Sequence, residues 1–230
     1  MNVSAVVPAG GSGTRMGGSV PKQFQLLNGK PILFYTLKTL QDSGVISEIV
    51  LVVPEKEYGM ACAEWIGKPE IVKKVVKGGE KRQDSVFNGL QEVSQDTEIV
   101  LIHDGVRPLL SKKMISGSID AARKYGAAIT AIPLSDTIKR VGSTGLVSKT
   151  IAREGLWRVQ TPQAFRFSLL QEAFAKAKPA NFYGTDEGAL IEHLGKPVKI
   201  VEGSEKNIKI TRPEDMDLCE TFVSKVFPEV

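Results

Sequence analysis

Short apolar runs alternate along this chain with segments whose apolar residues recur every three or four positions. Runs of the first kind are rich in β-branched residues, as buried strands are, and they occur at 3–7, 48–53, 72–76, 98–102, 127–132 and 198–201. The second pattern predicts helices at 31–41, 55–67, 82–93, 112–124, 168–178 and 186–194, and a last helix from Pro213 whose inward face carries Met216, Cys219, Phe222 and Val226. Strands that alternate with helices predict an α/β fold, in which right-handed crossovers build a mostly parallel, twisted sheet flanked by helices.

Four polar segments interrupt this pattern. Residues 136–151 contain two short β-prone runs around 142–145, which predict a hairpin. Because an isolated hairpin is only marginally stable in water, we expect it to pack on something outside its own domain. QTPQ (160–163) and TDE (185–187) predict polar loops that border helices, and the local pattern of 185–187 favours a helix cap. NIKIT (207–211) predicts a β-like run with Lys209 on an edge strand. We expect one domain, 1–230, with 136–153 as an arm.

A glycine-rich stretch follows the first predicted strand. Its loop glycines and cations are Gly10, Gly11, Gly13, Arg15 and Lys22. Glycines let the backbone bend sharply and expose successive N–H groups, so this stretch predicts a polyphosphate site. The spacing excludes a Walker loop, because Ser-Val follows Gly18 where Lys and Ser/Thr belong, and it excludes a dinucleotide fingerprint, because Met16 occupies the last glycine position. The alternative is a surface turn with two solvated charges.

The composition is typical of a globular protein that binds small anions. The 230 residues carry a net charge of +4, with a pI near 9.0. No basic block with interleaved aromatic residues predicts nucleic-acid binding, and no apolar run reaches membrane-spanning length. Because the first residues already form a predicted strand, we expect no signal peptide. Cys62 and Cys219 lack metal-ligand spacing, and we expect free thiols in the reducing cytoplasm, although the sequence leaves a disulfide open.

An acidic and a basic residue follow the predicted strand at 98–102. Asp104 comes directly after the strand end, where a carboxylate beside a phosphate loop is well placed to bind Mg²⁺. Arg107 holds either Asp104 or a substrate phosphate, and the alternative is a structural ion pair in a turn. We expect His103 to be a packed, hydrogen-bonded residue and not a base. Because ligands of such sheets bind at the carboxyl ends of strands, one cleft should collect the glycine loop, Gly78-Gly79 and 103–108.

Eight motifs, in their order along the chain, resemble one family of nucleotidylyltransferases. They read PAGGSGTRM, PKQF, GGEKRQDSV, HDGVRP, DTIKR, GLWRVQTPQAF, TDEGALIE and VEGSEKNIKITRPEDM. The family is that of the 2-C-methyl-D-erythritol 4-phosphate cytidylyltransferases of the non-mevalonate isoprenoid pathway. The resemblance implies a Rossmann-like nucleotidylyltransferase fold, cytidylyl transfer from CTP to a sugar-alcohol phosphate, and a homodimer joined by the 136–153 arm. Two departures are small, since Gly105-Val106 and Gly188-Ala189 stand where Ala-Ala and Ala-Ser are usual.

The resemblance also implies roles for individual residues. Nucleotide binding is assigned to Ala9, Gly10, Gly11, Gly13, Gly79 and Ser85. The catalytic cations are Arg15, Lys22 and Lys209. The residues on the acceptor side are Asp104, Arg107, Thr161 and Thr185, together with Thr137 and Arg153, which the arm lends to the partner subunit's site. The implied cofactor is Mg²⁺ or another divalent cation, with Asp104 as its ligand.

The chemistry of this reaction fits the residues. The acceptor phosphate monoester is largely dianionic at neutral pH, because its second pKa is about 6, so the nucleophile needs no general base. The reaction needs positive charge where two phosphates approach and where pyrophosphate leaves. The ribitol-5-phosphate cytidylyltransferases share PKQF, HD-x-x-RP and QTPQ, but Glu187 and Leu156-Trp157 favour the methylerythritol enzymes. A nucleotide-binding regulator without turnover and a nicotinamide dehydrogenase are weaker alternatives, because the catalytic cations are intact and the dinucleotide fingerprint is broken.

Overall fold

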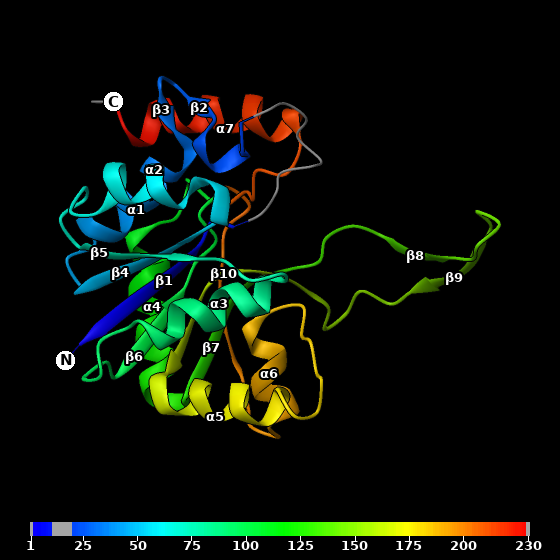
Figure 1. Cartoon of the computed structure of the whole chain (residues 1–230). Helices are drawn as coiled ribbons and strands as arrows, with labels where there is room; N and C mark the ends of the chain where they lie inside the picture. Colours follow the sequence, from blue (N-terminus) through cyan, green and yellow to red (C-terminus); the bar gives the residue numbers. More distant parts are fainter. Residues whose placement is uncertain (1, 11–19, 229–230) are drawn as a thin grey trace.

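The computed structural model describes residues 2–10 and 20–228, which fold around one mixed β-sheet (Figure 1). The seven strands described in this sheet run in the order β11-β7-β10-β6-β1-β4-β5. Their bounds are β1 Val3–Pro8, β4 Glu48–Val53, β5 Val72–Lys77, β6 Ile99–Ile102, β7 Ala127–Pro133, β10 Trp157–Arg166 and β11 Lys199–Glu202. The β10 strand runs antiparallel to β6 and β7, whereas the other neighbours are parallel. The predicted α/β class is therefore confirmed.

Helices cover both faces of the sheet. They are α1 Ile32–Asp42, α2 Tyr58–Trp65, α3 Arg82–Gln91, α4 Lys112–Tyr125, α5 Phe167–Ala177, α6 Glu187–His193 and α7 Pro213–Val226. Short 3-10 turns, η1 Lys22–Phe24 and η2 Glu55–Glu57, lie in the connections, as does a ribbon formed by β2 Leu26–Leu27 and β3 Lys30–Pro31. Among the described residues, no helix has the length and apolar character that crossing a membrane requires.

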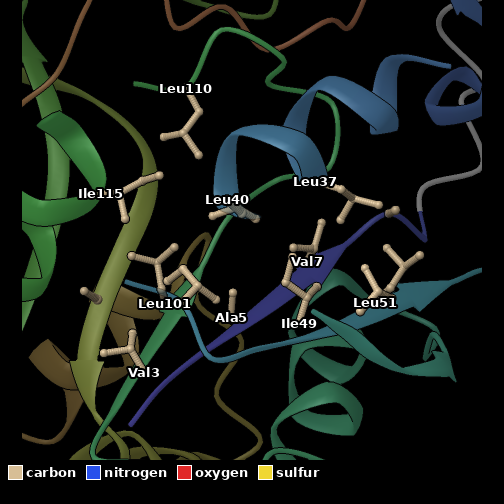
Figure 2. Packing of buried hydrophobic residues seen from close by; sticks show 14 of the residues in the cluster. Val3, Ala5, Val7, Leu37, Leu40, Ile49, Leu51, Leu101, Leu110 and Ile115 are labelled. Atoms are coloured by element: carbon tan, nitrogen blue, oxygen red, sulfur yellow. The ribbon is translucent and has the colours of Figure 1, made fainter. Parts of the chain in front are cut away.

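Alternate residues of β1 face different helical layers. Figure 2 shows the layer formed with α1 and α4, whose labelled residues are Val3, Ala5, Val7, Leu37, Leu40, Ile49, Leu51, Leu101, Leu110 and Ile115. Val6 packs on the opposite face, with residues of α3, α5 and α6 such as Leu90, Leu170 and Leu190. Each large apolar side chain that is fully buried in this way contributes about 1.5–3 kcal/mol, so both layers hold the ends of the central strands in place.

A third apolar cluster anchors the segment that carries Lys209. Tyr35 of α1 packs with Cys219 and Val223 of α7, and Ile210 and Val106 belong to the same cluster. The backbone N–H of Ile210 also donates to the carbonyl of Val106 at 2.9 Å. The chain after β11 is thereby fixed beside the loop that follows β6, at the carboxyl edge of the parallel strands.

Three expectations from the sequence are wrong. Residues 160–163 do not form a loop, because they lie inside β10, where Gln163 is buried and the pairing with β7 shifts register between Val159 and Gln163. Residues 207–211 form no strand, and their conformation is set by buried side chains and contacts with the loop after β6. Val226 is exposed on α7, whereas Val223 and Phe227 face the core.

The predicted hairpin is present and projects from the sheet. Its strands are β8 Ile138–Val141 and β9 Val147–Ile151, which pair in antiparallel fashion. Figure 1 shows this arm reaching away from the rest of the chain. Val141, Leu146 and Val147 expose their apolar side chains along it. The arm thus presents apolar surface to its surroundings, as an association surface does.

Candidate active site

A cavity of about 400 Å³ opens at the carboxyl edge of β1 and β6. Its walls are formed by Pro8, Ala9, Gly10, Lys22, Gln23, Gly79, Glu80, Lys81, Arg82, Ser85, Asp104, Val106 and Lys209. The described beginning of the glycine loop, the turn at Gly78-Gly79 and the loop after β6 therefore meet in one cleft, as the sequence predicts. Gly11, Gly13 and Arg15 lie outside the described residues, so their predicted roles remain predictions.

One side of the cavity is a close-packed turn between β5 and α3. The backbone N–H of Gly79 donates to the Ser85 hydroxyl at 3.0 Å, and that hydroxyl donates to the carbonyl of Lys81 at 3.1 Å. A Cβ atom on Gly79 would lie 2.4 Å from Cβ of Asp84, so only glycine fits there. The turn leaves Gly79 at the cavity wall, where a ligand can approach the backbone closely.

Another part of the cavity wall is built around the buried carboxylate of Asp104. Its Oδ2 lies 3.0 Å from Nζ of Lys209 and 3.4 Å from Nε of Arg107, and its Oδ1 lies 3.4 Å from Nε of Arg82. Burial by itself would raise the pKa of Asp104, but the charges of Lys209, Arg82 and Arg107 outweigh burial and hold this pKa far below its usual range. Asp104 is therefore an anion that fixes three cations.

Two lysines reach the cavity from different parts of the chain. Nζ of Lys22 donates to the carbonyl of Ile210 at 3.0 Å, while the neighbouring Lys209 pairs with Asp104. Because Ile210 is fully buried, its carbonyl is a fixed anchor for Lys22. The fold thus holds two predicted catalytic cations at adjacent places, although 186 intervening residues separate them in the sequence.

Arg107 adopts the first of its two predicted roles. Besides contacting Asp104, it donates through Nη1 to the backbone carbonyl of Asn207 at 2.7 Å. The Asn207 side chain in turn donates through Nδ2 to the carbonyl of Thr161 at 2.7 Å. Burial lowers the pKa of Arg107, and Asp104 opposes that shift. In this structure Arg107 lies behind the cavity wall and joins three segments.

His103 and Thr161 hold Asp104 in place through a chain of hydrogen bonds. The hydroxyl oxygen of Thr161 accepts the backbone N–H of Asp104 at 3.1 Å and lies 3.0 Å from Nδ1 of His103. Burial lowers the pKa of His103 to about 4, so the imidazole is neutral at physiological pH. His103 is fully buried and does not line the cavity, which agrees with the expected structural role.

The remaining predicted residues lie apart from the cavity wall. Thr185 is exposed in the loop before α6, where the adjacent Asp186 caps the helix by accepting the N–H of Ala189 at 3.0 Å. Thr137 and Arg153 are exposed at the base of the arm, and Arg153 donates to the carbonyl of Ser135. The structure of one chain therefore brings the predicted nucleotide-binding residues Ala9, Gly10, Gly79 and Ser85 together with Asp104 and Lys209, but not with Thr137 or Arg153.

Arg82 belongs to the site and was missed by sequence reasoning. It is the first residue of α3 and joins Asp104 to the buried carboxylate of Glu187. One signal was available, because Arg82 follows the Gly78-Gly79 turn at a strand-to-helix junction facing the cleft. The ion pair itself was not predictable, since Glu187 is distant in the sequence.

The two departures from the usual motifs lie at tightly packed positions. A Cβ atom on Gly105 would lie 3.0 Å from Cδ1 of Leu33 and 3.1 Å from Cβ of Ala9, so alanine would press on the cavity wall. A Cβ atom on Gly188 would lie 3.1 Å from Cγ2 of Ile129. Neither departure removes a charged group from the site.

Comparisons with known proteins agree in pointing to one family. The family model described as 2-C-methyl-D-erythritol 4-phosphate cytidylyltransferase matches residues 3–225. A protein of that name from Syntrophus aciditrophicus is 50% identical over 226 residues, which are 97% of this chain and 96% of the relative. The crystal structure of 4-diphosphocytidyl-2C-methyl-D-erythritol synthase from Anaerococcus prevotii is similar with a TM-score of 0.83 at 32% identity, over 97% of this chain and 98% of that chain. The corresponding cytidylyltransferase from Thermus thermophilus gives 0.80 at 33% identity, over 96% and 98%.

Proposed function

The chain belongs to the 2-C-methyl-D-erythritol 4-phosphate cytidylyltransferase family, and we propose the roles that its residues take in the family's reaction. The chain catalyses transfer of the cytidylyl group of CTP to 2-C-methyl-D-erythritol 4-phosphate, with release of pyrophosphate, in isoprenoid precursor synthesis. A bond forms between an acceptor phosphate oxygen and the α-phosphorus of CTP, and the bond from that phosphorus to the pyrophosphate oxygen breaks. The acceptor is already ionised, so no proton has to be removed.

The observation that carries the assignment of roles is the cation-lined cavity beside Gly79. Lys22, Lys209 and Arg82 face the space next to a turn suited to a nucleobase. We assign the base and ribose of CTP to Ala9, Gly10, Gly79 and Ser85, and its phosphates to Lys22 with Arg15, Gly11 and Gly13. Preorganised cations stabilise the charge that builds on the transferring and leaving phosphates, and no reorganisation is needed at that moment.

Lys209 is assigned to the acceptor phosphate. Its ammonium group is held by Asp104, while burial of the adjacent Ile210 fixes its backbone. Asp104, Thr161 and Thr185 complete the acceptor side, with Arg107 fixing the shape of this wall. We assign no role as a base to His103, because it is fully buried and does not line the cavity.

We propose that Mg²⁺ enters with the phosphates of CTP. The residues around Asp104 do not suit a resident divalent ion, because both oxygens of this single carboxylate already face cations. Within the described part of the chain, no three His, Cys, Asp or Glu side chains converge as a metal cluster. Mg²⁺ is commonly bound by substrate phosphates and water with little help from protein, and such an ion would neutralise phosphate charge.

We also propose a homodimer in which the 136–153 arms are exchanged. The projecting hairpin cannot be stable alone, and it exposes Leu146 and Val147. Thr137 and Arg153 do not line the cavity of their own chain, which supports a role in the partner subunit's site. Free Cys62 and Cys219 support a reducing cytoplasmic location, and the composition favours small anions over nucleic acid or membranes as partners.

The acceptor is tested by measuring pyrophosphate release from CTP and Mg²⁺ with either of two sugar-alcohol phosphates. We expect fast turnover with 2-C-methyl-D-erythritol 4-phosphate and little with ribitol 5-phosphate. Faster release with ribitol 5-phosphate would move the assignment to the ribitol-5-phosphate cytidylyltransferases. Binding of CTP without pyrophosphate release from either acceptor would indicate the nucleotide-binding regulator.

A further inference from the structure

Arg82 connects two buried carboxylates, Asp104 and Glu187, that lie far apart in the sequence. Its Nη1 lies 2.7 Å and 2.9 Å from the two carboxylate oxygens of Glu187, and its Nε lies 3.4 Å from Oδ1 of Asp104. The Glu187 side chain is only 1 % exposed, whereas that of Arg82 is 30 % exposed at the cavity wall. A single guanidinium group therefore joins the start of α3, the start of α6 and the loop after β6.

Gln83, the next residue of α3, contacts the loop before α6, which carries Thr185. The Gln83 side chain accepts the N–H of Gly184 at 2.9 Å and donates to the carbonyl of Phe182 at 3.0 Å. Gln83 thus binds Gly184, immediately before Thr185, and Arg82 binds Glu187, two residues after it. Since Thr185 itself is exposed, its position depends on these flanking contacts.

The charges explain why removing the Arg82 side chain alone would be destabilising. Burial raises the pKa of Glu187, and the charge of Arg82 opposes that shift. Burial also disfavours the charged form of Arg82, but Glu187 and Asp104 outweigh burial and raise the pKa of Arg82. Without Arg82, Glu187 would be a buried charge with no ion-pair partner among the described residues, which is strongly destabilising.

The nucleotide side does not depend on the Arg82 side chain in the same way. The bonds that shape it run from Gly79 to Ser85 and from Ser85 to the Lys81 backbone. Asp104 also keeps Lys209 and Arg107 when Arg82 is removed. Loss of the Arg82 side chain should therefore displace the loop around Thr185 while leaving the turn at Gly79 in place.

We propose that Arg82 is a positioning residue for the sugar-alcohol phosphate acceptor, which it serves by holding Glu187 and Asp104 so that the loop carrying Thr185 stays fixed next to the cavity wall. This inference rests on the proposed function. It assigns no contact between Arg82 and the reacting atoms, and it makes Gln83 a second support for the same loop.

The test compares KM for each substrate in Arg82→Gln, in the double variant Arg82→Gln/Glu187→Gln and in Gln83→Ala. Arg123→Gln is the matched control, because Arg123 pairs with Asp120 on an exposed face of α4. We expect Arg82→Gln to raise the KM for 2-C-methyl-D-erythritol 4-phosphate at least about tenfold, and the KM for CTP less than about threefold. The double variant should regain thermal stability, since no unpaired charge is left buried, but it should keep the high acceptor KM.

Hydrogen exchange of residues 182–190 gives a readout that does not need turnover. We expect faster exchange there in all three site variants and no change in Arg123→Gln. A normal acceptor KM in the double variant, an equal rise of both KM values, or unchanged exchange would overturn the positioning role. If Arg82→Gln does not fold, the double variant and Gln83→Ala still test the positioning role. Absence of turnover in the unaltered chain would contradict the proposed function, while the exchange result would still report on the loop.

Discussion

Nδ1 of His103 lies 3.0 Å from the hydroxyl oxygen of Thr161, which also accepts the backbone N–H of Asp104. Nε2 of the same ring faces the carbonyl of Arg107 at 3.3 Å, and a carbonyl oxygen can only accept a hydrogen bond. In the neutral ring we therefore assign the proton to Nε2, so that Nδ1 accepts from the Thr161 hydroxyl. A neutral His103 is therefore part of the support beneath Asp104, and a protonated ring would compete with the Thr161 hydroxyl.

Acidification should destabilise the fold through His103. The pKa of the folded state is lowered to about 4 from an ordinary 6.5, so between these values the unfolded chain binds a proton that the folded chain does not. The contribution of His103 to the free energy of unfolding is fully present above pH 6.5. It is lost as the pH falls toward 4, by about 3 kcal/mol in total. Urea unfolding at pH 7 and pH 4 measures the change.

His103→Gln provides the comparison, because an amide can accept from Thr161 and donate to the Arg107 carbonyl without titrating. The free energy of unfolding of this variant should fall less than that of the unaltered chain over the same pH interval. Other titrating groups, such as Asp104 and Glu187, contribute equally to both curves. Parallel curves would show that His103 is not the group responsible.

Lys22→Ala should lower turnover far more than it lowers stability. Removing one preorganised donor to a developing charge typically costs about 10²–10³ in rate. A lysine outside the core normally changes stability by only about 0.5 kcal/mol. We would measure kcat by pyrophosphate release and Tm by calorimetry, with the exposed Lys56→Ala as control. A near-normal kcat in Lys22→Ala would show that Lys22 does not contact the transition state.

Gly79→Ala should damage the nucleotide side of the cavity. The added methyl group would lie 2.4 Å from Cβ of Asp84, and the turn must open to accept it. We expect a loss of about 1–3 kcal/mol in unfolding free energy and a higher KM for CTP. Gly59→Ala in α2 is the control, since apart from its chain neighbours and the backbone of its own helix nothing lies within 4 Å of its added Cβ, and alanine should stabilise that helix by about 0.4–1 kcal/mol. Equal behaviour of the two variants would contradict this account of the turn.

Asp104→Asn should impair acceptor binding and leave the Mg²⁺ concentration required for activity nearly unchanged. The carboxylate oxygens face Lys209, Arg107 and Arg82, so the substitution disturbs these cations more than any metal ion. We expect the Mg²⁺ concentration that gives half-maximal activity at fixed CTP to change less than threefold. Chelation by EDTA should abolish the activity of both Asp104→Asn and the unaltered chain. A large rise in that concentration for Asp104→Asn alone would instead support direct ligation by Asp104.

Arm exchange predicts recovery of activity in mixed dimers. Lys22→Ala and Arg153→Ala should each be nearly inactive as homodimers. A heterodimer of the two, isolated by two different tags, should have about half of the normal activity, because one site combines an intact Lys22 with an intact Arg153 from the partner. Doubly tagged dimers of each single variant are the controls. Heterodimers as inactive as these controls would show that Arg153 acts within its own subunit.

Local pattern was sufficient for most elements and for part of the site. The first six predicted strands and most helices required only apolar spacing, since their burial follows from periodicity. Strand β10 was not predicted, because Gln160, Thr161 and Gln163 are polar, yet each is buried within the fold. Gln160 donates to the carbonyl of Ser204 at 2.8 Å, and Gln163 donates to Asp186 at 2.7 Å. Such partners come from distant segments and leave no periodic signal.

The sequence alone determined that a glycine-rich turn follows a buried strand and that Asp104 ends another, because strand ends in a parallel sheet share one edge. The tertiary structure decided how the charges are used. It surrounded Asp104 with Lys209, Arg107 and Arg82 and buried Glu187 against Arg82. Burial sets the energy of each of these charges, and burial depends on how segments more than a hundred residues apart pack together.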